Sequence, residues 1–518
     1  MAEFSTFLNI KKYSGYILLM VFLIIGIFNF KNYGISADEY LQYNLGKQCY
    51  NYVFKNDDTY LKLRNKEYGV AVQLGSYIIT DKILRLSSLR SIFLARHFIF
   101  HLFFLFGALA CYSLVQLLYN NRLLASIAFL LIVLNPRLYA HSFFNPKDIP
   151  FLAMLLICLW LTALAFSRGK IFFHILLGIA TGLLINIRIM GIMLLVFIML
   201  IYVRDLLIHQ DRKRKSIILL GFLATISLTL ILTWPFLWED PVNRFLYALK
   251  SMAWYHWDGS NLFFGRVITP ANLNWYYFPT WFLISNPLPY LVLGITGCGY
   301  LIYQFYLNPV KFISGDKERN HLLYFVVFLA PILATIILGS HLYNGWRHMY
   351  FVYAPFVMLM IFGLNALGNS KFKKPIYVLL ISSILFTGYF MIRIAPYQQV
   401  YFNILMRNYP AEYLRKNIDL DYWGLSYKQG LDCILKTDTS RLIKVAEPYY
   451  SKGVTLNVFL LSDEDQRRIR VTHLNQADYF LSNYHYHVFD YHEFAGKEYY
   501  RVRVMNNTLL SVFKLKPD

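Results

Sequence analysis

The sequence predicts a polytopic α-helical membrane protein with a small α/β domain at its C-terminal end. Long apolar runs, of the roughly 17–25 residues that cross a bilayer, recur along the first three quarters of the chain. Every second short connection between these runs is basic, as cytoplasmic loops are. From about residue 395 to 518, charged residues become frequent and short β-prone runs replace the apolar ones.

The membrane domain is expected to span residues 1–394 and to contain about eleven transmembrane helices. No cleavable signal peptide is expected, because the first apolar run lacks a small-residue cleavage site and further spans follow it. The composition agrees, since 57% of the residues are hydrophobic and only 15% are charged. The predicted spans are roughly 14–30, 91–118, 121–134, 149–167, 171–186, 189–204, 216–236, 281–307, 322–340, 349–367 and 376–394.

The basic loops predict the orientation of the chain. Lys11 and Lys12 precede the first span, and a basic segment at 212–215 separates the sixth and seventh spans. The pattern places the N-terminus in the cytoplasm and the segment 395–518 outside. Part of the formal charge of +21 is therefore a topology signal, and it does not indicate a nucleic-acid partner.

The C-terminal segment, residues 395–518, is expected to form an extracytoplasmic α/β domain with a sheet. Helical patterns lie near 412–416 and 425–435, and β-prone runs lie at 442–445, 454–460, 479–482, 499–504 and 509–515. The five cysteines show no spacing for a metal site or a disulfide framework.

An acidic pair, Asp38-Glu39, follows the first span and is the first candidate for chemistry. Carboxylates at the mouth of a helix bundle can accept a proton from a reacting hydroxyl. The alternative is a solvated pair at the membrane surface. The other polar clusters favour chemistry, because they are predicted to lie on the same, outer face.

The second cluster is His141, Asn145, Lys147 and Asp148 in the predicted outer loop at about 135–148. Asn145-Pro146 signals a turn, and Asp148 before an apolar run is also typical of a helix cap. Capping explains neither Lys147 nor His141 on an outer loop, where cations are under-used.

The third cluster is the segment Tyr343-Asn344-Gly345-Trp346-Arg347-His348 before the tenth span. Interface aromatics and a snorkelling arginine are the structural alternative. Arginine beside histidine suits a phosphate, because a guanidinium binds its oxygens in pairs. Arg188, on a short outer turn, is a further cation of this kind.

Two further groups are weaker candidates. Arg96, His97 and His101 lie within the second span, where ionisable groups usually face the bundle interior. His97 and His101 lack a third ligand, so no metal is expected. The aromatic loop at about 237–280, which includes Trp257, suits either a sugar or the membrane interface. No glycine-rich phosphate loop is present.

Together these pieces resemble the protein O-mannosyltransferase and lipid A aminoarabinose transferase group, polytopic glycosyltransferases of the GT-C fold. The resemblance rests on Asp38-Glu39, on Asn145-Pro146-Lys147-Asp148, on Asn286-Pro287-Leu288-Pro289 and on the segment 343–348, in that order over about residues 10–400. The chain lacks the carbohydrate-binding module of the eukaryotic mannosyltransferases. Its C-terminal domain matches no known role, although Asp421-Tyr422-Trp423-Gly424 is interpreted as a distinctive exposed run.

The resemblance implies a sugar donor linked to a polyprenyl phosphate, no nucleotide, and a base at Asp38 or Glu39. We expect Asp38 to be the base, Glu39 to orient the acceptor and Asp148 to be a second acidic group. The predicted phosphate ligands are Arg347, His348 and Lys147, with Arg96 and Arg188 as further candidates. The predicted acceptor or sugar contacts are His141, Asn145, Tyr343, Asn344, Trp346 and Trp257.

The expected reaction is an inverting transfer at the outer face of a bacterial inner membrane. The acceptor, whether protein, lipid or glycan, and a role for a divalent ion stay open. The alternative function is a non-catalytic carrier of lipid-linked sugars, a flippase, which needs ionisable groups along a transmembrane path. A sensor or scaffold built on the C-terminal domain is a second alternative.

Overall fold

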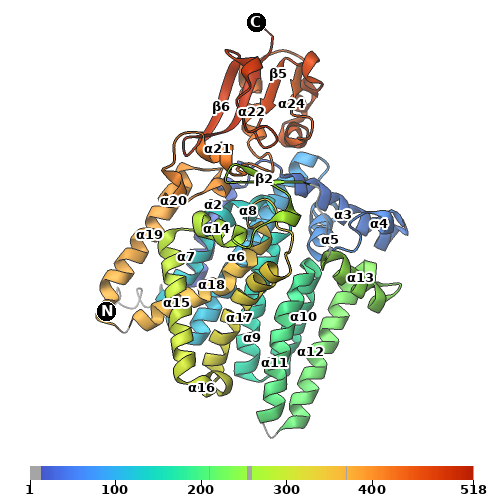
Figure 1. The fold of residues 1–518 in the computed structure, drawn as a ribbon. Helices are drawn as coiled ribbons and strands as arrows, with labels where there is room; N and C mark the ends of the chain where they lie inside the picture. Colours follow the sequence, from blue (N-terminus) through green and yellow to red (C-terminus); the bar gives the residue numbers. More distant parts are fainter. Residues whose placement is uncertain (1–12, 209–210, 254–258, 369, 517–518) are drawn as a thin grey trace, which may run out of the picture.

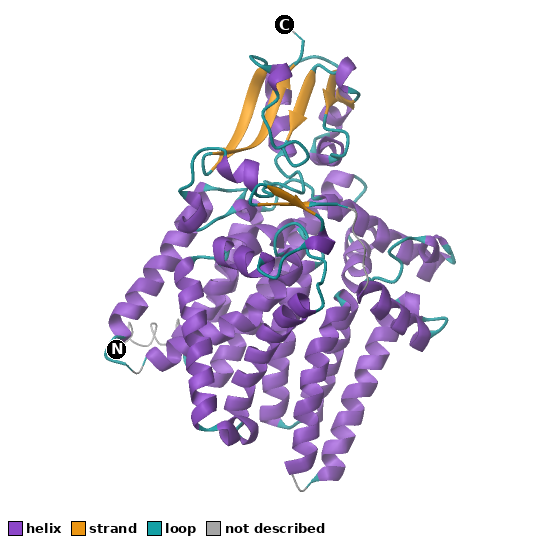
Figure 2. Cartoon of the chain, viewed as in Figure 1, coloured by secondary structure: helices purple, strands orange, loops and turns teal. Residues whose placement is uncertain are grey.

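The computed structural model describes residues 13–208, 211–253, 259–368 and 370–516. A bundle of long helices carries the small C-terminal domain at one of its ends (Figure 1). Almost all of the strand structure lies in that domain, and the bundle is helical throughout (Figure 2). The chain is an integral, multi-pass membrane protein.

Every predicted apolar run is helical. In the described ranges, eight helices are long and apolar enough to cross a membrane, or nine if the bent pair α7 and α8 forms one span. Two shorter apolar helices are α2 (Ser14–Asn29) and α10 (Ile171–Ile187). The long helices are α6 (Leu89–Tyr119), α9 (Asp148–Arg168), α11 (Ile192–Ile208) with the turn η2 (Ile189–Gly191), α12 (Arg212–Thr233), α15 (Leu288–Leu307), α17 (Asp316–Ile337), α18 (Tyr353–Leu367) with η5 (Arg347–Val352), and α19 (Lys373–Arg393).

Prolines begin new helices at two places. The predicted outer loop at about 135–148 is largely helical, because α7 (Arg122–Val133) is followed by α8 (Pro136–Phe144), and the two helices meet at 62°. The eighth predicted span, 281–307, splits at Asn286-Pro287 into α14 (Tyr277–Ser285) and α15. A proline suits the first turn of a helix but not its interior, because it has no N–H to donate.

Short polar elements cover the end of the bundle that bears the C-terminal domain (Figure 1). Residues 71–83 form α5 and the π-helical turn η1. The aromatic loop contains a small antiparallel hairpin of β1 and β2, which the sequence did not indicate. The elements are α3 (Ala37–Lys55), α4 (Thr59–Lys62), α5 (Ala71–Tyr77), η1 (Ile78–Ile83), η3 (Pro235–Leu237), α13 (Pro241–Ala253), β1 (Asn261–Phe263), β2 (Arg266–Ile268) and η4 (Pro270–Asn272).

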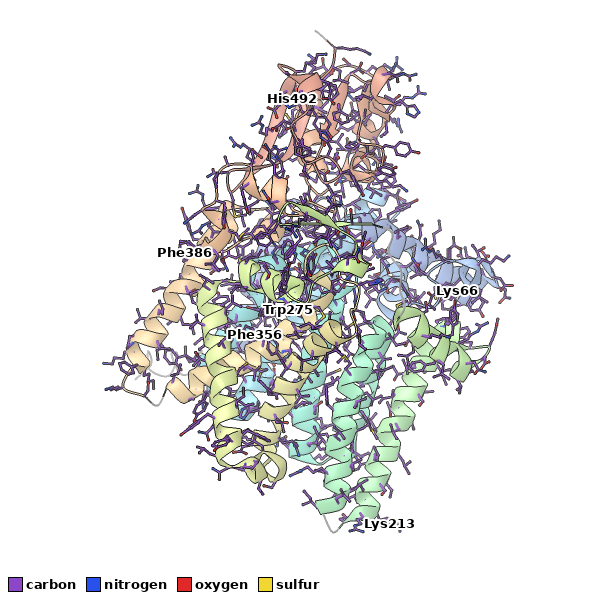
Figure 3. The ribbon with its side chains drawn as sticks, in the orientation of Figure 1. Lys66, Lys213, Trp275, Phe356, Phe386 and His492 are labelled. Atoms are coloured by element: carbon purple, nitrogen blue, oxygen red, sulfur yellow. The ribbon has the colours of Figure 1, made fainter. Side chains whose placement is uncertain are left out.

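The opposite end of the bundle carries the basic connections. The hairpin between α11 and α12 and the short helix α16 (Pro309–Ser314) lie there (Figure 1), and Lys213 marks this end in Figure 3. His492 marks the far end of the C-terminal domain in the same view. The two ends therefore differ in charge as a membrane protein's two faces do.

The C-terminal domain contains a five-stranded mixed sheet in the order β4-β3-β5-β7-β6. Strand β3 pairs in parallel with β4 and β5, and β7 pairs antiparallel with β5 and β6. The strands are β3 (Ile443–Ala446), β4 (Ile469–Val471), β5 (Tyr479–Ser482), β6 (Glu498–Val504) and β7 (Asn507–Lys514). The helices are α22 (Tyr427–Thr437), α23 (Gly453–Asn457) and α24 (Asp463–Arg468), with the turns η7 (Val458–Leu460), η8 (Leu474–Gln476) and η9 (His492–Phe494).

One predicted strand is wrong and one strand was missed. The run 454–460 is helical, because the Glu447 carboxylate accepts from the backbone N–H groups of Val454 and Thr455 and so caps α23. Strand β4 is only three residues long, too short to show a pattern.

The chain between the two parts, residues 394–426, packs on both. It runs through η6 (Gln398–Val400), α20 (Ile404–Arg407) and α21 (Tyr413–Asn417). Ile394 and Tyr397 belong to the apolar core of the C-terminal domain. Phe402 and Trp423, further along the chain, belong to the core of the bundle instead. The two cores are therefore interleaved across the predicted boundary at residue 395.

Candidate active site

Asp38 lies in the first turn of α3, at the end of the bundle beneath the C-terminal domain. The backbone N–H of Ser36 donates to Glu39 Oε2 at 2.8 Å, which is half of a capping box and fixes where α3 begins. Ser36 Oγ donates to the carbonyl oxygen of Phe144 at 2.8 Å and ties this helix start to the end of α8. The Asp38 side chain is 36% exposed.

Arg347 joins two carboxylates that are far apart in the sequence. Its Nη1 donates to Asp38 Oδ2 at 2.9 Å and lies 3.5 Å from Asp148 Oδ2. Its guanidinium carbon lies 5.0 Å from the centre of the Tyr343 ring and 4.8 Å from that of Trp423. Arg347 is only 5% exposed, and its Nε has no hydrogen-bond partner among the described residues.

A left-handed turn presents Arg347. Asn344 and Gly345 have φ values of 57° and 73°, which reverse the chain just before η5. Asn261, fully buried on β1, holds this turn: its Oδ1 accepts from the Asn344 N–H at 2.9 Å and its Nδ2 donates to the Leu342 carbonyl at 3.1 Å. Asn261 was not identified from the sequence, where it is one asparagine in an aromatic loop.

Asp148 is the first residue of α9, and Asn145 caps that helix in its place. Asn145 Oδ1 accepts from the backbone N–H groups of Lys147 and Asp148, at 3.2 and 2.9 Å. Asn145 Nδ2 then donates to Asp148 Oδ2 at 2.9 Å. The Asp148 carboxylate also pairs with Arg188 and is 2% exposed. Asp148 therefore does not serve as the cap of α9.

The orientation of Asn145 determines the tautomer of His141. Because Oδ1 of Asn145 faces two N–H donors, its Nδ2 must face His141 Nδ1, at 3.1 Å, and donate to it. His141 then carries its proton on Nε2 and donates to the Tyr350 hydroxyl oxygen at 3.0 Å. A chain of hydrogen bonds thus runs from Asp148 through Asn145 and His141 to Tyr350.

Lys147 and Arg188 add two more cations beside the carboxylates. Lys147 Nζ lies 3.4 Å from the centre of the Tyr68 ring, and the described residues place no carboxylate within salt-bridge distance of it. Burial lowers the pKa of Lys147 well below its usual value, and the charges of Arg188 and Arg347 lower it further. Arg188 also keeps a buried Nε without a partner among the described residues.

Glu39 points away from this group, although it neighbours Asp38 in sequence. Successive residues on an α-helix are about 100° apart around the axis. Glu39 is fully buried, and its Oε1 lies 3.0 Å from His97 Nε2. Arg96, also fully buried, donates to Ser76 Oγ at 2.7 Å and stacks against Tyr43 and Phe100. Glu39, His97 and Arg96 form a second cluster between α3 and α6.

The remaining predicted contacts fall in several places. The Tyr343 ring packs edge-on against His348 at 4.2 Å, beside Arg347. Asn344 acts through its backbone in the turn described above. Trp346 is 1% exposed and packs on Phe282 and Tyr350 in the core, so it presents no face to a sugar. Trp257 lies outside the described residues.

The run Asp421-Tyr422-Trp423-Gly424 is not exposed, contrary to the sequence interpretation. Asp421 and Trp423 are 3% and 5% exposed. The Trp423 ring lies 5.1 Å from that of His141 and 5.7 Å from that of Phe144. The run therefore closes over Arg347 and His141, which its position in a charge-rich segment did not indicate.

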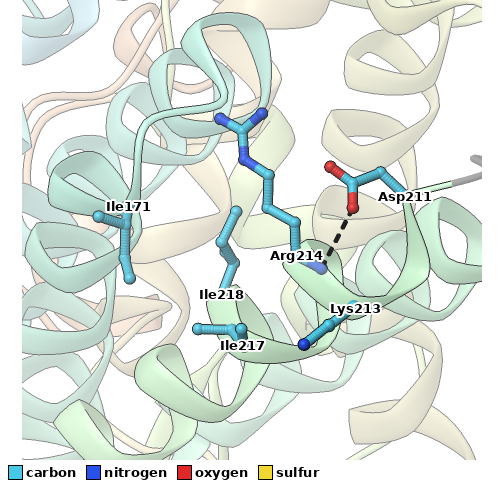
Figure 4. A pocket seen from close by; sticks show the side chains of 6 residues that line it. All are labelled: Ile171, Asp211, Lys213, Arg214, Ile217 and Ile218. Carbon is cyan, nitrogen blue, oxygen red and sulfur yellow. Dashed lines mark hydrogen bonds between the residues drawn. The ribbon is translucent and has the colours of Figure 1, made fainter.

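A surface hollow of about 360 Å³ lies elsewhere, at the α11–α12 end (Figure 4). It is lined by Ile171, Asp211, Lys213, Arg214, Ile217 and Ile218. Its cations belong to the basic loops that orientation already explains, and Asp211 caps α12 by accepting from the Arg214 N–H. In the described ranges, no group of three or more His, Cys, Asp or Glu side chains is placed to hold a metal ion.

A solved structure resembles this chain over nearly its whole length. No family model matches the chain, and no curated protein matches it either. Among solved structures, ArnT from Cupriavidus metallidurans in the apo state matches with a TM-score of 0.52 and 11% identity over 97% of this chain and 98% of that one. The same ArnT bound to undecaprenyl phosphate gives a TM-score of 0.49 and 12% identity over 96% and 98%.

The chain therefore has the GT-C fold of membrane glycosyltransferases, over nearly its whole length. The expected resemblance to the lipid A aminoarabinose transferase group is confirmed at the level of fold.

Proposed function

We propose that this protein is an inverting glycosyltransferase that moves a sugar from a polyprenyl-phosphate donor to an acceptor hydroxyl. One observation carries the proposal: three cations beside two carboxylates keep unpaired donors. Arg347 Nε and Arg188 Nε have no partner among the described residues, and Lys147 Nζ has only the face of Tyr68. Buried N–H donors are rarely left unpaired, so these donors fit an anionic ligand.

Asp38 is the proposed base. It is the most exposed carboxylate of the cluster, and among the described residues only one of its oxygens is engaged, by Arg347. The acceptor hydroxyl would lose its proton to Asp38 as its oxygen attacks the anomeric carbon. The bond from that carbon to the donor phosphate oxygen breaks in the same step, so a single displacement inverts the anomeric configuration.

Arg347, Lys147 and Arg188 are the proposed phosphate ligands, with His348 beside them. The leaving phosphate gains negative charge as its bond to the sugar breaks. Preorganised cations stabilise such charge strongly where water is scarce. Asp148 holds Arg188 and Arg347 in place through its ion pairs, and Asn145 holds Asp148.

The proposed location is a bacterial inner membrane, with the cluster and the C-terminal domain on the periplasmic side. The basic connections at the opposite end support this orientation by the positive-inside rule. The central helix α9 supports an enzyme over a carrier. Between Asp148 and Arg168 it contains no Asp, Glu, His, Lys or Arg, whereas a transport path needs such groups.

The test is transfer by purified protein from a panel of radiolabelled polyprenyl-phosphate sugars, comparing wild type with Asp38→Asn. We expect one donor to be used, and the variant to lose about 10²–10⁴-fold in turnover. Near-normal turnover by a folded Asp38→Asn protein would show that the base is another residue. The absence of transfer from every donor would favour the carrier.

A further inference from the structure

Trp423 joins the C-terminal domain to the cluster around Arg347. It follows the last helix of the bundle by some thirty residues in the chain, yet its ring covers the Arg347 guanidinium at 4.8 Å. The Tyr343 ring lies 5.0 Å from the same carbon. Cations are attracted to aromatic faces at this range, so the two rings restrict where the guanidinium can lie.

The turn that carries Trp423 is held from within the C-terminal domain. The Asp421 carboxylate accepts from the N–H groups of Leu425 and Ser426, at 3.0 and 2.9 Å. Asn483, in the loop after β5, donates to the Asp421 carbonyl at 2.7 Å. Gly424 follows Trp423 with φ at +71°, a conformation that suits glycine. The turn that carries the indole is therefore tied to the C-terminal domain through Asn483, while the indole itself packs in the core of the bundle.

Asn457 links this turn to the segment that leads into Asp38. It is fully buried on α23, and its Nδ2 donates to the Gly424 carbonyl at 3.0 Å. Its Oδ1 accepts from the N–H of Ile35, three residues before Asp38, at 3.0 Å. The contact is close, because a Cβ on Gly34 would lie 2.5 Å from the Leu425 carbonyl oxygen. One side chain thus holds the chain before Asp38 and the chain after Trp423 together.

We propose that Trp423 is a positioning residue through which the C-terminal domain holds Arg347 in its phosphate-binding orientation. This inference rests on the proposed function, because it assigns the domain a part in the same site. The C-terminal domain then forms one side of the phosphate site around Arg347. Its separation from the bundle, even with both parts folded, would leave Arg347 free to turn towards solvent.

The experiment measures binding of undecaprenyl phosphate to the full-length purified protein, a readout that needs no transfer. Trp423→Leu keeps an apolar side chain but removes the aromatic face, and we expect the Kd to rise about tenfold. Trp423→Phe keeps a face and should stay within about threefold of wild type. Trp275→Leu, at a 67%-exposed tryptophan whose ring packs on Tyr276, is the matched control and should leave the Kd unchanged.

A double-mutant cycle then separates positioning from general packing. In an Arg347→Met background, Trp423→Leu should change the Kd by less than about twofold, since the group it positions is gone. The same factor in both backgrounds would overturn the inference, as would equal Kd values for wild type and folded Trp423→Leu. If wild type itself does not bind undecaprenyl phosphate, the proposed function falls first and this inference with it.

Discussion

Two buried ionic clusters lie at opposite ends of the bundle, and both hold more cations than carboxylates. Near the α11–α12 hairpin, one carboxylate, Asp205, serves three cations: Arg204 at 2.8 Å, Lys215 at 3.0 Å and Arg319 at 3.8 Å. Beneath the C-terminal domain, Arg347 joins two carboxylates, Asp38 and Asp148, and Arg188 also pairs with Asp148. The first arrangement joins α11, α12 and α17, as a structural tie does.

The difference lies in the exposure of the carboxylate: the Asp38 side chain is 36% exposed, whereas that of Asp205 is 6% exposed. Around Arg347, buried N–H donors remain free among the described residues, and aromatic rings from three separate segments, at 68, 343 and 423, lie against the cations. Burial of charge alone does not mark a site, because both clusters are buried. Unused donors beside an accessible carboxylate do, since they are costly unless a ligand uses them.

The sharpest test of this comparison removes one carboxylate from each end. Asp148→Asn should lower transfer about hundredfold, because Arg188 and Arg347 lose the group that orients them. Asp205→Asn should leave turnover per folded molecule nearly unchanged but destabilise the protein by about 3–5 kcal/mol, since buried cations lose their partner. Transfer assays and thermal melting of both purified variants measure this. Loss of turnover in folded Asp205→Asn would contradict the comparison.

Lys147 provides a second test, through pH. Its lowered pKa means that it loses its charge at a lower pH than an ordinary lysine does. An anionic donor needs the charged form, so the donor KM of wild type should rise as pH increases on the alkaline side. Lys147→Arg should remove that rise, because a guanidinium stays charged. Lys147→Met should raise the donor KM about tenfold already at neutral pH.

The KM of each variant is measured as a function of pH with the donor identified in the transfer panel. A wild-type KM that is flat to alkaline pH, or an Arg variant that keeps the wild-type profile, would remove Lys147 from the phosphate site.

Glu39 tests whether the two adjacent carboxylates have different roles. Glutamine at this position can still accept the Ser36 N–H and keep the capping box. Glu39→Gln should therefore keep turnover within about fivefold and cost about 1–3 kcal/mol of stability through the weakened contact with His97. A loss of turnover as large as that expected for Asp38→Asn would identify Glu39 as the base in place of Asp38.

The sequence predicted the helices better than the geometry of the site. All eleven apolar runs are helical, because a bilayer requires long apolar segments whatever their neighbours. Asp38, Lys147, Asp148 and Arg347 were expected on one face, and they do lie together there. The alternation of basic and non-basic loops along the sequence was enough to predict that these residues share a face.

What the sequence did not predict depends on tertiary contacts. Asp38 and Glu39 look alike as a pair and separate only because a helix starts at Ala37. Trp423 lies in a polar stretch, and packing against His141, Phe144 and Arg347 buries it. Trp346, in the segment with Arg347, turns into the core instead. Neighbours distant in the chain decide each of these outcomes.

The smallest predicted effect compares two buried histidine–tyrosine pairs, one at each end. His141 donates to the Tyr350 hydroxyl at 3.0 Å, and His174 Nδ1 lies 2.6 Å from the Tyr202 hydroxyl near Asp205. Tyr350→Phe leaves the His141 N–H unpaired and loosens its hold on Asn145, so transfer should fall about threefold to tenfold. Tyr202→Phe makes the same chemical change at the other end and should leave transfer unaltered.

Both variants remove one buried hydroxyl, so their melting temperatures should fall by similar amounts, which makes each the stability control of the other. The chemical change is the same in both variants. The ratio of their turnover numbers, measured with saturating donor, therefore shows whether the place of the histidine–tyrosine pair in the molecule matters. Equal turnover for both would mean that the chain from Asp148 to Tyr350 is a packing feature, like its counterpart at the opposite end. A selective loss in Tyr350→Phe would place His141 and Asn145 among the groups that keep Asp148 aligned with Arg347.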